Sequence, residues 1–133
     1  MDYPIIKSKL TDELKRIIYQ GFRQHSLKVK GFDGLGEEAV SFEIHHGQEF
    51  VGAVVVQLFW RQFHIKYLFV DEKYRGRGLG RHLMLHALDF GRELGCDFAF
   101  VETMNFQAVD FYQKLGFVTE LTRNGYANNS SLL

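Results

Sequence analysis

The stretch VDEKYRGRGLGRHLM, residues 70–84, places three glycines and three arginines in one short segment. It follows the apolar run FHIKYLFV at residues 63–70, which is typical of a β-strand. Apolar residues after it recur at the spacing of one helical face, at Leu79, Leu83, Ala87, Phe90 and Leu94. Gly95 then supplies a helix stop. The segment is therefore predicted to be a turn from a strand into a long amphipathic helix.

The composition indicates an ordinary globular protein. The chain has 133 residues, 46% of them hydrophobic and 24% charged, so we expect one packed domain over residues 1–133. Lys plus Arg and Asp plus Glu are balanced at 16 each, which gives no overall positive field for nucleic acid or an anionic membrane. Cys96 is the single cysteine, and MDYPIIKSKL lacks the apolar centre of a signal peptide. We therefore expect a cytoplasmic protein that binds neither nucleic acid nor a membrane.

The rest of the chain predicts a mixed α/β fold. Residues 11–24 have helical spacing and begin at Thr11, a good helix cap. Strand-like runs are predicted at residues 39–46, 49–60, 63–70, 96–103 and 117–122, and a short helix at residues 106–115. Only GQ and RQ separate the first three runs, which favours antiparallel hairpins, whereas a helix between strands favours parallel pairing.

The glycine-rich turn has the properties of a phosphate site. The first N–H groups of a helix have no partner within the helix and point beyond its end. Glycines allow close approach of a ligand, and arginines add to the positive potential of the helix dipole. These residues are Gly76, Gly78, Gly80, Arg75, Arg77 and Arg81. A dinucleotide fingerprint is excluded because Arg81 stands where its last glycine is needed, so the turn favours another pyrophosphate ligand.

Two motifs together resemble the GNAT-type N-acetyltransferase superfamily. Residues 75–80, RGRGLG, match its pattern (Q/R)-x-x-G-x-(G/A), and NFQAVDFYQKLGF at residues 105–117 is similar to its second conserved block. The resemblance implies a mixed, mostly antiparallel central sheet flanked by helices, with a V-shaped splay between the family's fourth and fifth strands. It implies acetyl-coenzyme A as cosubstrate and no metal. The departures are a first strand reduced to PIIK and a last strand that would only be starting at NNSSLL.

The resemblance also implies roles for individual residues. The backbone of the glycine-rich turn would hold the pyrophosphate, and the edge of the preceding strand would pair with the pantetheine arm. The implied coenzyme-binding residues are Leu68, Phe69, Val70, Arg75, Gly76, Arg77, Gly78, Leu79, Gly80, Arg81 and Asn105. Tyr112 corresponds to the family tyrosine that returns a proton to the departing thiolate.

Acetyl transfer to an amine needs a neutral nucleophile, a polarised thioester carbonyl and a proton for the leaving sulfur. We expect the N–H of Val70 to stabilise the oxyanion. His64 lies roughly where relatives that acetylate lysines carry a basic glutamate, and Glu102 and Glu43 are rival bases. His82 and His86 have a metal-binding spacing, but Leu83 replaces the glutamate of H-E-x-x-H, so no metal site is expected.

The predicted function is therefore transfer of acetyl from acetyl-coenzyme A to a primary amine, on a small molecule or a peptide, by direct attack. The expected surroundings of the acceptor are Trp60, Arg61, Gln62, His64 and the loop GFDGLGEE, in which Glu37 and Glu38 would attract a cation. The alternative is a coenzyme-binding sensor or partner-binding module without turnover. The sequence leaves open the acceptor, the base and the oligomeric state, a homodimer included.

Overall fold

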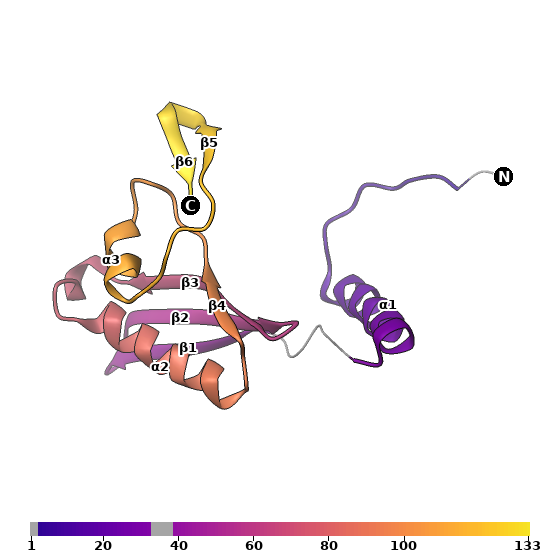
Figure 1. The fold of residues 1–133 in the computed structure, drawn as a ribbon, viewed down its shortest axis with the longest axis horizontal. Coiled ribbons are helices and arrows are strands. Elements are labelled where there is room, and N and C mark those ends of the chain that lie inside the picture. The colour runs from indigo at the N-terminus through magenta and orange to yellow at the C-terminus, as the bar shows by residue number, and fades with distance from the viewer. Residues whose placement is uncertain (1–2, 33–38) are drawn as a thin grey trace. The chain divides into compact units, whose positions relative to one another are not determined.

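The computed structural model describes residues 3–32 and 39–133. The chain divides into two compact units, Met1–Gly36 and Glu37–Leu133, both traced in Figure 1. Most of the loop GFDGLGEE, Glu37 and Glu38 included, lies outside the described residues. The single domain that we expect over residues 1–133 stays a prediction.

The described residues of the first unit form one helix, α1 (Asp12–Lys30). Its predicted cap is confirmed, because the Leu14 N–H donates to Thr11 Oγ1 at 3.1 Å. The helix runs past the predicted end and stops at Gly31, whose φ of 68° is the left-handed conformation that favours glycine. Residues 3–11 form no regular structure, so PIIK is not a strand here.

A four-stranded sheet organises the second unit, in the spatial order β1-β2-β3-β4. Its strands are β1 (Val40–His46), β2 (Glu49–Phe59), β3 (Gln62–Val70) and β4 (Phe98–Val101). The first three pair antiparallel, and β4 pairs parallel with β3 after the intervening helix. This arrangement confirms the predicted combination of hairpins with one helix-linked parallel pair.

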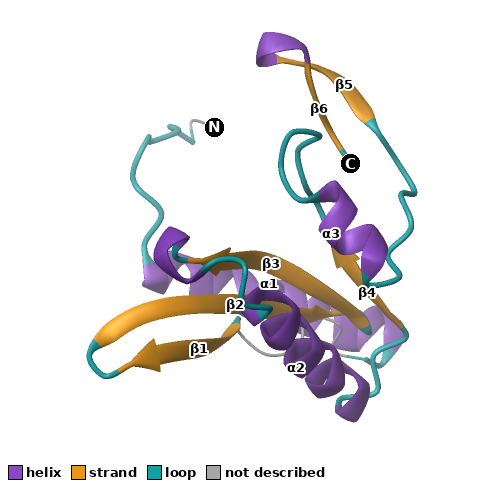
Figure 2. Ribbon diagram, turned by 90° about the vertical axis from the view of Figure 1, so that its left-hand side faces the viewer, coloured by secondary structure: helices purple, strands orange, loops and turns teal. Residues whose placement is uncertain are grey.

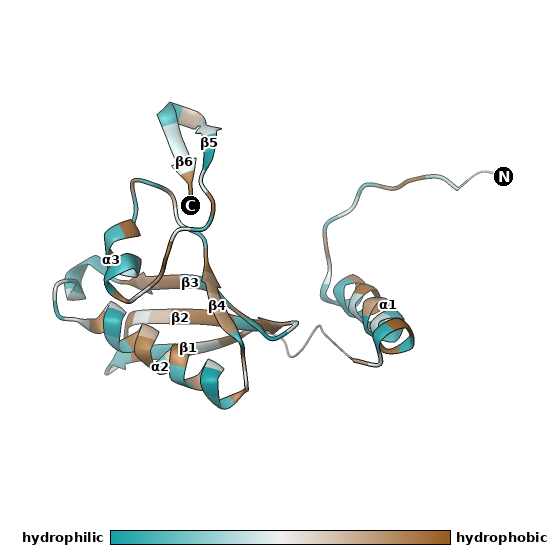
Figure 3. Ribbon diagram, in the orientation of Figure 1, coloured by the Kyte–Doolittle hydropathy of each residue, from teal (hydrophilic) through white to brown (hydrophobic). Residues whose placement is uncertain are grey.

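Helix α2 (Leu79–Glu93) covers one face of this sheet, as Figure 2 shows. Leu83, Met84 and Ala87 of the helix are buried against a core formed by side chains of the two central strands. Those strand residues are Val54, Val56, Phe63 and Ile65. Figure 3 shows the hydrophobic residues concentrated along β2 and β3, whereas α2 alternates between hydrophobic and hydrophilic positions.

A bulge divides β3 into two halves. The register with β2 shifts between Val55 and Val56, so that Lys66 is an extra residue between the paired positions Ile65 and Tyr67. Ile65 before the bulge and Leu68 after it both pack into the core. Alternation alone would have turned one of them to the opposite face, because side chains along a strand have a period of two.

The pairing between strands β3 and β4 ends just before this bulge. Their pairing runs from Gln62 with Phe98 to Ile65 with Val101 and goes no further. Residues 66–70 of β3 therefore extend beyond β4 with a free backbone edge on that side. This geometry confirms the V-shaped splay that the family resemblance implies.

The C-terminal part contains a short helix and a small hairpin. Its elements are α3 (Val109–Lys114), β5 (Arg123–Tyr126) and β6 (Ser130–Leu132). The predicted strand at residues 117–122 is wrong, since this segment joins no sheet and its Val118 side chain is 82% exposed. A run of strand-forming residues makes a strand only where a neighbour offers hydrogen bonds. Over the described residues, no helix has the length and apolarity to span a membrane.

Candidate active site

The glycine-rich turn begins where β3 ends. A short 3₁₀ turn at Glu72–Tyr74 comes first, capped by Asp71, whose Oδ1 accepts from the Lys73 N–H at 3.1 Å. Gly76 and Gly78 then adopt φ values of 79° and 76°, which other residues rarely reach. Gly78 is the N-cap of α2 and has no side chain to satisfy the first helical N–H groups. The turn therefore presents free backbone donors, as the sequence predicts.

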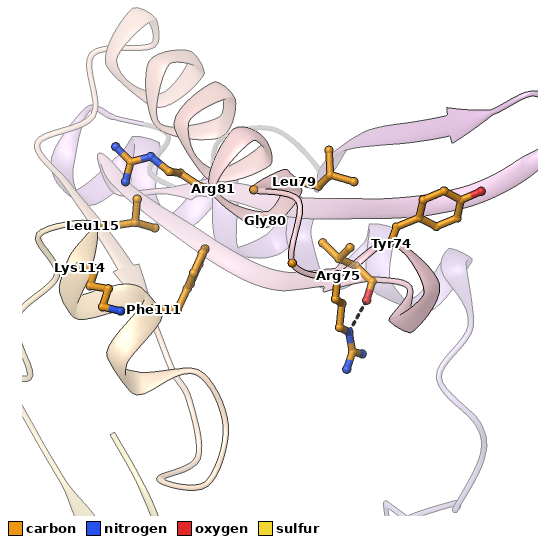
Figure 4. Close-up of a pocket in the computed structure, with 11 residues that line it drawn as sticks. Tyr74, Arg75, Leu79, Gly80, Arg81, Phe111, Lys114 and Leu115 are labelled. Atoms are coloured by element: carbon orange, nitrogen blue, oxygen red, sulfur yellow. Dashed lines mark hydrogen bonds between the residues drawn. The ribbon is translucent and has the colours of Figure 1, made fainter.

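The three arginines of the turn have different surroundings. Arg75 Nε donates to the Val70 carbonyl at 2.9 Å, a bond drawn in Figure 4. The guanidinium of Arg77 lies over the ring of Tyr74, 5.4 Å from its centroid. The described residues offer Arg81 no hydrogen bond or ion pair. Arg75 therefore fixes the end of the strand, while Arg81 keeps its charge for a ligand.

A cavity of about 380 Å³ opens in front of the turn (Figure 4). Its lining comes from the end of β3, the turn, the start of α2 and one side of α3. The lining residues are Val70, Tyr74, Arg75, Gly76, Gly78, Leu79, Gly80, Arg81, Phe111, Lys114 and Leu115. Sequence reasoning gave no site role to Tyr74 or to the last three. The signal for those three was their place in the second motif block, residues 105–117.

Glu49 ties the turn to the hairpin formed by β1 and β2. Its carboxylate accepts from Lys73 Nζ through one oxygen and from Tyr74 Oη, at 2.8 Å, through the other. The hydrogen bonds from Lys73 and Tyr74 lower the pKa of Glu49, and the same bonds raise the pKa values of both donors. No sequence motif joins these residues, because Glu49 and Tyr74 are 25 positions apart.

Replacing Glu49 with glutamine is expected to weaken coenzyme A binding roughly two- to fivefold, the usual range for an exposed ion pair. Without the carboxylate, Tyr74 and the Arg77 that lies over it lose their fixed position beside the turn. Calorimetric titration with coenzyme A measures the effect. Glu93→Gln removes the same charge at the far end of α2 and serves as the control. Equal affinities in the two variants would contradict an anchoring role.

The free edge of β3 presents backbone groups to the splay. The Asp71 N–H donates to the Val51 carbonyl at 2.7 Å, toward β2. Since successive residues of a strand direct their N–H groups to opposite edges, those of Leu68 and Val70 face away from β2. Phe69 instead directs its N–H toward β2. Of the three predicted edge residues, two thus offer donors to the splay.

Tyr112 occupies a half-buried position on α3. Its ring meets those of Phe111 and Phe117 edge to face, at centroid distances of 5.2 and 5.7 Å. Burial raises the pKa of its hydroxyl, which makes no hydrogen bond within the described part of the chain. Tyr112 lines a second cavity, of about 660 Å³, between β4, α3 and residues 116–121. The structure thus places it beside β4 and not in the cavity of the glycine-rich turn.

The candidate bases differ in their surroundings. His64 lies on β3 beside Phe100 of β4, with ring centroids 5.2 Å apart, at the part of the sheet where the splay begins. Burial lowers the pKa of His64, and the negative charge of Glu102 partly offsets this effect. Glu102 is exposed and lines the second cavity. Glu43 is exposed on β1, where its Oε1 lies 3.1 Å from Nε2 of His45. His64 and Glu102 are therefore the two candidates that lie near the splay.

Two further predictions fall elsewhere in the fold. Asn105 Oδ1 accepts from the Ser131 N–H at 3.2 Å, so in this structure the side chain holds the C-terminal hairpin. Its coenzyme contact stays a prediction. The turn with Trp60 and Arg61 precedes β3, at the end opposite to the glycine-rich turn. Among the described residues, no three His, Cys, Asp or Glu side chains gather as a metal site.

Comparison with known proteins gives the family. The model of the acetyltransferase (GNAT) family matches residues 9–117, most of the chain. A crystal structure of an acetyltransferase from Bacillus cereus aligns with a TM-score of 0.75 over 96% of this chain and 93% of that one, at 23% identity. The chain belongs to the GNAT acetyltransferase family.

The curated relatives are similar over part of their length. Blasticidin-S acetyltransferase of Streptomyces morookaense is 41% identical over 70 residues, which are 52% of this chain and 52% of the relative. N-alpha-acetyltransferase 30 of Xenopus laevis is 40% identical over 81 residues, or 56% of this chain and 30% of the relative. The match thus spans about half of the first relative and less of the second.

Proposed function

We propose that the protein transfers the acetyl group of acetyl-coenzyme A to a primary amine by direct attack. The observation that carries this proposal is the continuity between the glycine-rich turn and the splay, because residues 66–70 lead from one to the other. A ligand with a pyrophosphate at one end and an amide-bearing arm at the other fits both parts. A GNAT-fold acetyltransferase from Bacillus subtilis, similar at a TM-score of 0.61, was solved with coenzyme A.

The direction of the strand orients the coenzyme. With the pyrophosphate at Gly76–Arg81, the pantetheine arm enters the splay at Val70, and its sulfur reaches toward the point where β3 and β4 meet. The N–H of Leu68 then lies closer to the thioester carbonyl than that of Val70. We therefore assign the oxyanion contact to Leu68, in place of the Val70 expected from the sequence, and keep Val70 as a donor to the arm.

His64 is the proposed base, since it lies beside the meeting point of the two strands. Its pKa is lowered from the ordinary value of 6.5, so the imidazole is neutral at pH 7 and able to accept a proton. It loses that ability only as the pH falls through its lowered pKa.

We expect the acidic limb of kcat/KM against pH to lie below pH 6.5 in the wild type and to be absent in His64→Gln. Steady-state rates across the pH range measure this limb. His82→Gln, on the exposed face of α2, is the matched control and should keep it. An acidic limb that persists in His64→Gln would assign the base to Glu102 or to ordered water.

The acceptor is proposed as an amine on a small molecule or a peptide. Both kinds of acceptor appear in the names of the relatives, blasticidin-S in one and the N-alpha position in the other. The balanced charge of the chain, with 16 cationic and 16 anionic residues, gives no preference for a polyanionic target.

Thiol release from acetyl-coenzyme A tests the proposal, with a panel of small amines and peptides as acceptors. Turnover that depends on an amine, with the acetylated product identified by mass spectrometry, is the expected result. Tight coenzyme A binding without turnover on any amine would instead favour the sensor or partner-binding module.

A further inference from the structure

Two cationic side chains border the cavity of the glycine-rich turn and have no hydrogen bond or ion pair with any described residue. Arg81 reaches from α2 and Lys114 from α3, and both line the same cavity (Figure 4). We propose that Lys114, together with Arg81, binds the 3′-phosphate of coenzyme A and makes the protein discriminate against 3′-dephospho-coenzyme A. The inference rests on the proposed function, because it names a further contact of the same ligand.

The charge distribution in the cavity supports an anionic occupant. Its lining contains Arg75, Arg81 and Lys114 but no carboxylate, in a chain whose net charge is zero. Two cations outside the cavity have carboxylate partners, Lys73 with Glu49 and Arg92 with Asp89. Local positive potential that the protein leaves uncompensated is available to a bound anion.

Lys114 has no competing polar contact in the part of the chain that the structure describes. Asp110 stands one turn earlier on α3, at the spacing of a helical ion pair, yet the two side chains form none. Within the described residues, no other carboxylate or hydrogen-bond acceptor engages either Lys114 or Arg81. Neither side chain therefore has to give up a protein contact to meet a phosphate.

The two anionic groups of coenzyme A require different partners. The pyrophosphate is satisfied by backbone donors, which the turn from Gly76 to Gly80 supplies. The 3′-phosphate is a monoester that carries about −1.5 to −2 charges at pH 7, so its binding calls for side-chain cations. Arginine offers a planar fork to phosphate oxygens, and lysine a point charge. Phe111 and Leu115 provide apolar surface in the same cavity for the part of the ligand between these groups.

Calorimetric titrations with coenzyme A and with 3′-dephospho-coenzyme A test this assignment. The quantity compared is the ratio of the two dissociation constants in the wild type, Lys114→Gln, Arg81→Gln and Arg92→Gln. We expect the wild type to favour coenzyme A by about tenfold or more, as for a charge-assisted hydrogen bond. Lys114→Gln and Arg81→Gln should each reduce this preference. Arg92→Gln, which removes a positive charge at the opposite end of α2, should retain it.

The dephosphorylated ligand also controls for folding, since a variant that still binds it with wild-type affinity is intact at the turn. Equal binding of both ligands by the wild type would overturn the inference and leave the proposed function standing. A preference that is unchanged in Lys114→Gln or in Arg81→Gln would overturn the pairing of these two cations. Failure of the wild type to bind either ligand would instead overturn the proposed function.

Discussion

Tyr112→Phe is expected to lower kcat for acetyl transfer by about 10²- to 10⁴-fold, the usual contribution of a general acid. The thiolate that leaves the tetrahedral intermediate needs a proton, and Tyr112 is the proposed donor. Burial raises the pKa of the Tyr112 hydroxyl above the ordinary value of about 10. The hydroxyl therefore keeps its proton at neutral pH and can donate it. Stopped-flow or steady-state thiol release measures the loss.

Because phenylalanine keeps the ring contacts with Phe111 and Phe117, the stability of the fold should change little. Tyr126→Phe removes the same hydroxyl from the C-terminal hairpin and is the matched control. If Tyr112→Phe turned over within about twofold of the wild type at saturating acetyl-coenzyme A, the proton would have to come from water, and the assignment would fail.

Gly52→Ala is expected to destabilise the fold by about 3 kcal/mol, through overpacking against a backbone that has little room to move. Gly52 pairs with Val70 at the end of the free edge of β3. A Cβ atom there would lie 2.7 Å from the Phe69 carbonyl oxygen and 3.2 Å from the Val70 Cα. The strand end would have to shift, so coenzyme A affinity should fall together with the free energy of unfolding.

Urea titration followed by circular dichroism measures the stability, and calorimetry the affinity. Gly21→Ala is the matched control, because the new methyl group would meet nothing within 4 Å on α1 and alanine favours a helix. A wild-type midpoint for Gly52→Ala would show that β3 can move at no cost and would contradict the expected overpacking.

Local patterns were sufficient to predict the framework of the site. Gly76, Gly78 and the apolar spacing from Leu79 onward define a turn and a helix within a few residues of one another. Both signals, a glycine-dependent backbone conformation and a single amphipathic face, are determined by residues close together in the sequence. The hairpins of β1, β2 and β3 were predictable for the same reason.

The rest depended on contacts between distant parts of the chain. The anchor between Glu49 and Tyr74 exists only because the register of β2 and β3 brings the start of β2 beside the end of β3. Residues 117–122 have the composition of a strand, yet Leu121 is 67% exposed and the segment has no ladder to join. Lys114 belongs to a motif that the sequence shows. That it lines a cavity without carboxylates could not be predicted, because this depends on the packing of α3 near α2.

The bulge at Lys66 makes β3 one residue longer than the stretch of β2 with which it pairs. Deleting Lys66 would close the bulge and make the ladder continuous from Ile65 to Tyr67, with Leu68 still facing the core. The half of β3 before Lys66 is paired on both edges, whereas the half after it is paired on one edge only. Substitutions in the second half can therefore alter ligand preference without breaking the pairing between β3 and β4.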